Sequence, residues 1–304
     1  MEDKRENAKG SPAPGISPEL HSWGEGRFMG KVLVTGHTGF IGKVLVARLL
    51  ALGYSVIGYS TSTGQNILDV NQLIEAMNDV SYVYHLAAKV SFCKKHAQEI
   101  FGVNAHGTAN VFAAARTVGH IEKIVITSTA LITGLANTPN LLMDESYAIA
   151  DPQANPYIYS KCVAEAICFQ NQDIPFVIVM PSTARVISSI VAPPGGCNII
   201  DVRDVADGMI AAMEHGKPSN KYLLTNRNIT FRELHKYAIP LPRWSRKVVR
   251  LFANSFLVDN AYLYKYYSNS KARRELNWTP QRNPIENFTS WWHPGMKRQT
   301  EGAR

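Results

Sequence analysis

The chain has 304 residues, of which 45% are hydrophobic and 18% are charged. This length is enough for one large or two modest domains with a buried core. No uninterrupted apolar run approaches the roughly 18 residues of a membrane span, and the charged N-terminal stretch lacks the apolar segment of a signal peptide. We therefore expect a globular, cytoplasmic protein.

Cysteine usage favours the same compartment. The four cysteines show no C-x-x-C spacing, and they lie at positions Cys93, Cys162, Cys168 and Cys197. They fit reduced thiols better than a disulfide framework.

The net charge of +8 is unevenly distributed. Residues 240–304 hold twelve Lys or Arg against four Asp or Glu, so this segment carries the whole excess. Such a cluster can attract an anionic cofactor, an anionic membrane surface or nucleic acid, or it can be a solvated basic face. No nucleic-acid motif accompanies it, and no residues cluster with metal-ligand spacing. We expect neither a nucleic-acid partner nor a metal.

The order of the predicted elements indicates the fold class. Short β-branched runs alternate with segments of helical periodicity. We expect strands at 31–35, 55–59, 81–86, 123–128 and 176–180. We expect helices at 39–52, 70–78, 100–118, 158–171 and 201–214. This alternation predicts right-handed βαβ units and an α/β fold with a doubly wound parallel sheet of the Rossmann type.

Three regions follow from the same pattern. Residues 1–28 are rich in Pro, Gly and polar side chains and are predicted to be a flexible leader. Residues 29–229 are predicted to form a dinucleotide-binding Rossmann domain. Residues 230–304 are predicted to form a smaller, mainly helical substrate region over the carboxyl edge of the sheet, where ligands bind in open α/β folds.

A glycine triplet lies between the first strand and the first helix. Gly36, Gly39 and Gly42 belong to the segment Gly-His-Thr-Gly-Phe-Ile-Gly. A turn this tight needs residues without Cβ, and the helix N-terminus offers free N–H groups to a pyrophosphate. A tight turn that binds nothing is the simpler alternative, but the position after a strand favours a cofactor site. We expect its contacts to come from Gly36, Thr38, Gly39, Phe40, Ile41 and Gly42.

Tyr157 and Lys161 form a Tyr-x-x-x-Lys pair on a predicted helix. This spacing places both side chains on one face, one turn apart. A free tyrosine has a pKa of about 10, and a nearby ammonium favours phenolate and lowers that pKa. With the glycine turn, the pair indicates hydride transfer on a nicotinamide cofactor, with Tyr157 moving the proton. An ordinary solvent-facing pair is the alternative.

These motifs resemble the extended form of the short-chain dehydrogenase/reductase superfamily, in its dihydroflavonol-reductase-like and NAD-dependent epimerase/dehydratase branch. Further ordered matches carry the resemblance from about Met29 to Trp292. They are His85-Leu86-Ala87-Ala88, Asp69-Val70, Asn104 with Gly107-Thr108, Asp201-Val202-Arg203-Asp204-Val205, and Ser270-Lys271-Ala272-Arg273-Arg274-Glu275-Leu276.

The resemblance implies roles for individual residues. Thr129 is the catalytic hydroxyl in Thr127-Ser128-Thr129, Tyr157 the acid or base, and Lys161 its partner. The implied cofactor contacts beyond the glycine turn are Ser60, Thr61, Asp69, Val70, Leu86, Ala87, Ala88, Asn104, Ser128, Tyr157, Lys161, Pro181 and Ser182. The resemblance also makes a homodimer plausible.

The end of the second strand bears on the choice of cofactor. An Asp or Glu there usually binds the ribose of NAD, but this chain has Tyr59-Ser60-Thr61-Ser62-Thr63. Hydroxyls can bond a 2′-phosphate, although no Arg is present to pair with it. The segment favours NADP, and NAD remains open.

The chain departs from the family pattern after the fifth predicted strand. Met180-Pro181 stands where relatives have Arg-Pro, and the substrate loop at residues 183–198 is short. A small or protruding substrate, an open site or impaired turnover would each fit a short loop.

Three functions remain in competition. The first is an NAD(P)-dependent oxidoreductase acting on a carbonyl or alcohol substrate, and we expect this one. The second is an NAD-dependent nucleotide-sugar epimerase or a dehydratase, although Ala130 and Leu131 stand where a dehydratase wants acidic residues. The third is a non-catalytic cofactor-binding protein, against which the presence of both Tyr157 and Lys161 argues.

Membrane-surface binding is a separate possibility. A basic face (Arg243, Arg246, Lys247, Arg250) and an apolar face (Trp244, Val248, Leu251, Phe252, Phe256) are predicted on one helix. A basic amphipathic helix can lie on an anionic bilayer. A helix that buries its apolar face in the substrate region is the interpretation we favour.

Overall fold

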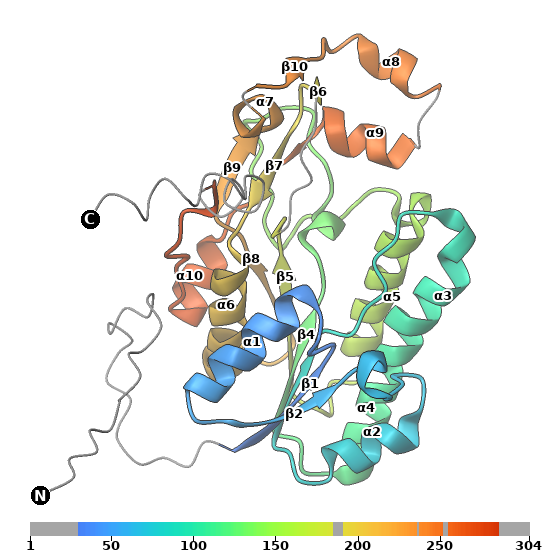
Figure 1. Cartoon of the computed structure of the whole chain (residues 1–304), viewed down its shortest axis with the longest axis vertical. Helices are drawn as coiled ribbons and strands as arrows, with labels where there is room; N and C mark the ends of the chain where they lie inside the picture. The colour runs from blue at the N-terminus through green and yellow to red at the C-terminus, as the bar shows by residue number, and fades with distance from the viewer. Residues whose placement is uncertain (1–29, 185–190, 236, 252–254, 286–304) are drawn as a thin grey trace, which may run out of the picture.

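A parallel six-stranded sheet forms the centre of the molecule (Figure 1). The computed structural model describes residues 30–184, 191–235, 237–251 and 255–285. The strand order is β2-β1-β3-β4-β5-β8. The strands are β1 (Lys31–Thr35), β2 (Ser55–Tyr59), β3 (Tyr82–His85), β4 (Lys123–Thr127), β5 (Phe176–Pro181) and β8 (Asn220–Leu224). The predicted doubly wound parallel sheet is confirmed.

The strand order reverses direction beside β1. The chain adds β2 on one side of β1 and then returns to add β3 on the other side. Thr35 at the end of β1 pairs with both Tyr59 and His85. The segments that follow these three strands therefore leave the sheet side by side, at the kind of switch point where open α/β sheets bind ligands.

Helices cover both faces of the sheet (Figure 1). One layer contains α1 (Phe40–Ala51), α6 (Val202–His215) and α10 (Ser270–Leu276), and the other contains α2 (Val70–Met77), α4 (Gly107–Val118) and α5 (Pro156–Gln170). Successive residues of a strand point to opposite faces. Val32 and Val34 accordingly join the core under α1 and α6, while Leu33 joins the core under α4. Both faces are buried, which explains why β1 reads as a continuous apolar run.

The helix predicted at 100–118 begins earlier and is interrupted. It consists of α3 (Ala97–Phe101), a π-helical turn at Gly102–His106, and α4. π turns inside helices are rare and shift the direction of the side chains they carry. Asn104 lies within this turn.

Helix α5 starts at Pro156, two residues before the predicted start. The side-chain oxygen of Asn155 accepts hydrogen bonds from the amides of Tyr157 and Ile158, at 2.9 and 3.3 Å. Proline at the first helical position needs no such partner. This cap fixes Tyr157 in the first turn of α5.

The remaining elements lie at one end of the molecule, beyond the carboxyl end of β5 (Figure 1). They form a three-stranded sheet of order β11-β7-β9 and a two-stranded sheet of β10 and β6. The strands are β6 (Val191–Ala192), β7 (Gly196–Ile199), β9 (Arg227–Thr230), β10 (Ile239–Pro240) and β11 (Tyr264–Lys265). The short helices are α7 (Phe231–Leu234), α8 (Ser245–Val249) and α9 (Ser255–Tyr262).

The described part of the short loop at 183–198 therefore contributes strands to this end of the molecule. β6 pairs with β10, and β7 pairs with β9 and β11. The centre of that loop, the predicted leader at 1–28 and the C-terminal residues from 286 onward lie outside the described residues. Helix α10 returns to the main sheet and packs against α6 and β8.

Gly195 is the point where this loop is clamped to the C-terminal part of the chain. Its amide donates to the carbonyl oxygen of Ala261 at 3.1 Å. A Cβ added at Gly195 would lie 2.4 Å from the carbonyl oxygens of Ala261 and Leu263. Backbone atoms cannot swing aside as a flexible side chain can, so the contact has no room for a methyl group.

We predict that Gly195→Ala lowers the free energy of unfolding by about 1–3 kcal/mol, the usual cost of overpacking. Gly102→Ala is the control, because a Cβ at Gly102 would meet nothing within 4 Å. The control should be neutral or slightly stabilising. Urea unfolding of both variants measures the difference, and equal stability would contradict the clamp.

Candidate functional site

The glycine turn packs tightly on its inner side. Gly36 has a φ of +72°, and a Cβ there would lie 2.8 Å from the amide nitrogen of Ala87. A Cβ on the buried Gly42 would lie 2.2 Å from the carbonyl oxygen of Gly36. Gly39 and Phe40 face outward at the start of α1, which has no acidic residue in its first turn. The positive end of the helix is thus presented to an anion.

A cluster of hydroxyls lies beside this turn, at the end of β2. The Thr38 hydroxyl is 2.9 Å from the hydroxyl of Ser60 and 2.9 Å from that of Ser62. The Ser60 and Ser62 hydroxyls are 3.1 Å apart. Thr61 is exposed in the same short 3-10 turn. Thr38, Ser60 and Ser62 form a hydroxyl cluster. Two of its members, Thr38 and Ser60, are predicted cofactor contacts, and the predicted contact Thr61 lies beside them.

Asp69 and Val70 begin α2. One carboxylate oxygen of Asp69 accepts from the amides of Asn71 and Gln72, at 3.0 and 3.2 Å. Asp69 and Val70 are only partly buried. The carboxylate therefore caps its own helix, and this local role accounts for an acidic residue at this position.

A buried histidine joins β1, β3 and α4. His85 Nδ1 is 2.8 Å from the Thr35 hydroxyl, and His85 Nε2 is 3.1 Å from the Thr108 hydroxyl. The Thr35 oxygen also lies 3.2 Å from the amide nitrogens of Leu86 and Ala87, which donate to it. The next predicted contact, Ala88, is exposed.

The donors along this chain can be assigned in one consistent order. The Thr108 hydroxyl donates to the carbonyl oxygen of Asn104 at 2.7 Å, so it must accept from His85 Nε2–H. Nδ1 is then the acceptor for the Thr35 hydroxyl. The imidazole is neutral in this arrangement, in keeping with a pKa that burial, followed by the nearby Lys161 charge, lowers to about 3.

Asn104 connects the π turn to α5. Its side-chain oxygen accepts from the amide of Lys89 at 2.8 Å, and its Nδ2 donates to the Lys89 carbonyl and to the Ser160 hydroxyl, at 3.0 and 2.8 Å. The Ser160 hydroxyl in turn donates to the carbonyl oxygen of Tyr157 at 2.8 Å. Asn104 therefore helps to position α5, and the sequence carried no signal for its contact with Ser160.

The three predicted catalytic residues are buried near the end of β4. Thr129 follows that strand, and its hydroxyl accepts from the amide of Leu131 at 3.3 Å. The same hydroxyl is near enough to the phenol of Tyr157 on α5 to affect its pKa. Lys161 lies one turn further along α5, where its ammonium donates to the carbonyl oxygen of Thr127 at 2.8 Å. Ser128 is also buried, and its amide donates to Val179 of β5.

Burial sets the protonation of this pair. It raises the pKa of Tyr157 to about 12, and the hydrogen bond from Thr129 opposes that shift. It lowers the pKa of Lys161 to about 8. The predicted lowering of the Tyr157 pKa is therefore wrong for this structure. The prediction considered only the nearby ammonium, whereas burial makes the charged phenolate costly and raises the pKa. The Tyr157 phenol is therefore protonated near neutral pH.

Pro181 and Ser182 lie at the end of β5. The Ser182 hydroxyl donates to the side-chain oxygen of Asn198 at 2.6 Å. Ser182 therefore ties β5 to β7 and joins the two ends of the short loop at residues 183–198.

Two aromatic side chains that the sequence analysis did not assign to the site lie next to Tyr157. The Phe92 ring meets the Tyr157 ring edge to face, with 5.8 Å between centroids. Phe256 of α9 lies against Phe92 at 5.4 Å. These residues are remote in sequence from Tyr157 and belong to no motif, so only the fold could bring them together.

The residues present fit a nicotinamide dinucleotide. Added Cβ atoms at Gly36 and Gly42 would collide with backbone, and the open side of the turn faces the start of α1. Gly36, Gly39 and the first turn of α1 could hold a pyrophosphate. The hydroxyl cluster could hold the adenosine ribose, and Lys161 with Tyr157 could hold the nicotinamide end.

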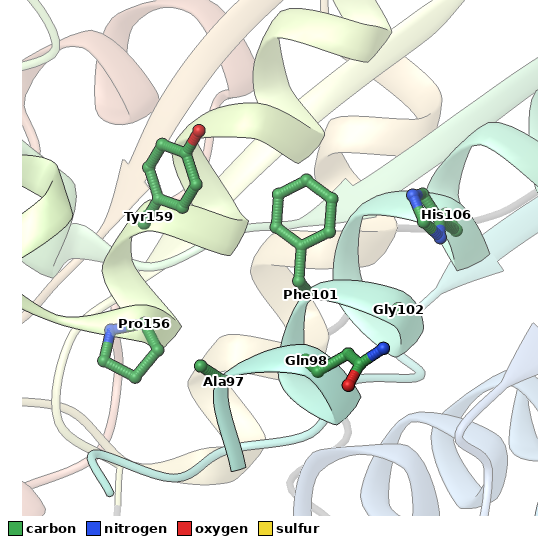
Figure 2. A pocket seen from close by; sticks show the side chains of 7 residues that line it. All are labelled: Ala97, Gln98, Phe101, Gly102, His106, Pro156 and Tyr159. Atoms are coloured by element: carbon green, nitrogen blue, oxygen red, sulfur yellow. The ribbon is translucent and has the colours of Figure 1, made fainter. Parts of the chain in front are cut away.

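A separate hollow of about 490 Å³ lies on the outer side of α3 and α5 (Figure 2). It is lined by Ala97, Gln98, Phe101, Gly102, His106, Pro156 and Tyr159. Tyr159 stacks on Phe101 with ring centroids 5.9 Å apart and is 37% exposed, whereas Tyr157 is 8% exposed. Of the two tyrosines of α5, Tyr159 therefore lines the outer hollow, whereas Tyr157 is buried.

The sheet order, glycine turn and buried Thr-Tyr-Lys group define an extended short-chain dehydrogenase/reductase fold. The model of the NAD dependent epimerase/dehydratase family matches residues 32–185, about half of the chain. The protein belongs to this NAD(P)-dependent family of oxidoreductases and epimerases.

Individual relatives carry the names of reductases. A putative dihydroflavonol 4-reductase of Synechocystis is 32% identical over 65% of this chain and 68% of its own length. Tetraketide alpha-pyrone reductase 1 of Arabidopsis thaliana is 24% identical over 73% of this chain and 86% of its own.

Solved structures share the fold. A short-chain dehydrogenase/reductase superfamily protein from Agrobacterium tumefaciens with bound NAD is 20% identical, with a TM-score of 0.69 over 90% of this chain and 100% of its own. RMD from Pseudomonas aeruginosa complexed with NADPH is 18% identical, with a TM-score of 0.69 over 88% of this chain and 99% of its own.

We predict that His85 makes the protein sensitive to acid. Its pKa is about 3 in the fold and about 6.5 in an unfolded chain. Below pH 6.5 the unfolded chain binds the extra proton, so stability falls as the pH drops towards 3, by up to about 1.4 kcal/mol per pH unit.

Urea unfolding between pH 6.5 and 4.5 tests this on His85→Gln. The variant should be less stable at pH 7 but should lose less stability on acidification than the unmodified protein. His96→Gln, at a partly exposed surface position, should keep the original slope. Parallel slopes for His85→Gln and the unmodified chain would contradict the assignment.

Proposed function

We propose that this protein is an NAD(P)-dependent reductase that converts a carbonyl to an alcohol, with Tyr157 as the proton donor. The observation that carries the proposal is the buried Thr129–Tyr157 contact beside Lys161, at the carboxyl end of β4. The raised pKa of Tyr157 keeps the phenol protonated near neutral pH, which suits the reductive direction.

The chain's own residues would act as follows. The Thr129 and Tyr157 hydroxyls donate hydrogen bonds to the carbonyl oxygen and polarise the C=O bond. A reduced nicotinamide held there would supply the hydride for the new C–H bond. Tyr157 passes its proton to the oxygen as it becomes an alkoxide, and the nearby Lys161 ammonium stabilises the resulting phenolate.

The substrate proposed here has an apolar body. Phe92 lies against the Tyr157 ring, and Phe256 extends the aromatic surface towards α9. Aromatic walls of this kind hold apolar groups through burial, while Thr129 and Tyr157 orient the single polar atom. A nucleotide-sugar substrate would instead need groups that bind a diphosphate.

We predict that Tyr157→Phe lowers kcat by about 10²- to 10⁴-fold, the usual contribution of general acid catalysis, while cofactor affinity changes little. The assay is NADPH and NADH oxidation with a panel of apolar aldehydes and ketones. Tyr159→Phe is the matched control, because that ring stacks on Phe101 at the outer hollow, and it should keep full activity.

The outcomes separate the alternatives. Turnover that survives in Tyr157→Phe would refute the assigned role. A purified protein that retains its cofactor, reduces no carbonyl and interconverts nucleotide sugars would be an epimerase. Cofactor binding without either reaction would assign a cofactor-binding role.

We further propose a preference for NADP over NAD. The hydroxyl cluster offers several donors at the place where NAD-binding relatives of the fold have a carboxylate. The carboxylate of Asp69 caps α2 instead. Hydroxyl donors favour a 2′-phosphate, and the absence of a charge at Ser60 removes the repulsion that would reject it.

Ser60→Asp should lower the affinity for NADPH by about tenfold or more, roughly 1.4 kcal/mol, and should leave or improve the affinity for NADH. Ser55→Asp adds the same charge at the opposite end of β2 and should change neither affinity. Fluorescence titration measures both. A tighter complex with NADH in the unmodified chain would reverse the preference.

Two other expectations stay predictions. The unpaired cysteines, all four in the described residues, support a reducing compartment such as the cytoplasm. A homodimer is predicted from the family resemblance.

A further inference from the structure

Strand β10 and helix α8 lie at one end of the molecule (Figure 1). Large apolar side chains in and beside these elements are exposed. We define the apical patch as Ile239, Trp244, Val248 and Leu251. Their exposed fractions are 67%, 72%, 48% and 77%. The expectation that this helix buries its apolar face is therefore wrong for these side chains. Phe256 alone is buried, on the separate helix α9, and Phe252 lies outside the described residues.

Three of the four patch residues follow a helical spacing. Trp244, Val248 and Leu251 recur at spacings of four and three residues, as on one side of a helix. Val248 lies in α8, Trp244 is its N-cap, and Leu251 follows its C-cap residue. Large apolar side chains that are exposed singly need no explanation, but four of them between residues 239 and 251 indicate an interaction surface.

Positive charge surrounds the patch. Between residues 237 and 251 the chain has four cations and no carboxylate. Arg246 and Arg250 both pair with Asp259 of α9, at 2.8 and 2.7 Å. Four cations against this one carboxylate leave the surface strongly basic, and Lys247 is exposed beside Val248.

We propose that the apical patch docks the protein onto an anionic lipid bilayer. Trp244 and Leu251 would enter the headgroup boundary, and Lys247 with its arginine neighbours would meet the lipid phosphates and carboxylates. A second copy of the chain fits less well, because its own patch would bring like charges together. Among the described residues, no helix is both long and apolar enough to cross a bilayer, so the attachment is to the surface.

The connection to α9 gives the docking site a link to the candidate active site. Asp259 holds α8, and Phe256 of the same helix lies against Phe92 beside Tyr157. Docking through α8 would thus place α9, which borders the apolar substrate site, next to the bilayer. The docking itself stands independently of the proposed reaction, because it involves neither cofactor nor catalytic residues.

The test is co-sedimentation of the full chain with phosphatidylcholine vesicles and with equimolar phosphatidylcholine and phosphatidylserine vesicles. We expect binding to the anionic vesicles that weakens with salt. Trp244→Ser/Leu251→Ser should lower that affinity by about tenfold or more, and Lys247→Glu should lower it on anionic vesicles. Leu50→Ser/Leu142→Ser, which changes two exposed leucines elsewhere, should bind like the unmodified chain.

Failure of the unmodified chain to bind either vesicle would overturn the proposal. So would equal binding by the Trp244→Ser/Leu251→Ser variant, provided that thermal unfolding shows the fold intact. A lipid-free dimer that this variant dissociates in sedimentation velocity would assign the patch to a second copy and overturn the lipid assignment.

Discussion

The buried hydrogen-bond chain through His85 is the constraint on which the site depends. It starts at Thr35, at the carboxyl end of β1, and reaches Asn104 in the π turn through Thr108. Asn104 then holds Ser160, which bonds the carbonyl of Tyr157. The glycine turn and Tyr157 are on elements more than a hundred residues apart, and this chain of hydrogen bonds connects them.

The cost of burying an unpaired polar group explains why the groups in this chain all have hydrogen-bond partners. A buried polar group without a partner costs about 1–3 kcal/mol, so a half-formed network would be worse than an apolar one. Here the side-chain donors all have acceptors in a consistent order, and a neutral imidazole avoids the cost of burying a charge. The π turn serves the same end, because a regular helix would aim Asn104 differently.

Local patterns predicted most of the main sheet and little of what lies above it. β1, β2 and the glycine turn could be predicted from β-branched runs and from the glycines that follow them, because residues adjacent in sequence determine these elements. β8 was not predicted, because its first two residues, Asn220 and Lys221, are polar and leave only a short apolar run. The small sheets were missed because β7 pairs with β9 and β11, from distant parts of the chain. Motif matching named Tyr157 and Lys161, whereas Phe92, Phe256 and the Asn104–Ser160 contact required the fold.

The fixed direction of the hydrogen bonds around His85 has a dynamic consequence. The backbone groups at the ends of this chain of hydrogen bonds cannot exchange donor and acceptor roles, so breaking one bond leaves a buried neighbour without a partner. This cost favours opening of the whole chain at once. The amides of Leu86 and Ala87, which donate into Thr35 at the head of the chain, would then exchange their protons with solvent only when β1, β3 and α4 open as one unit. The turn that receives the cofactor and the helix that carries Tyr157 would belong to a single cooperative folding unit.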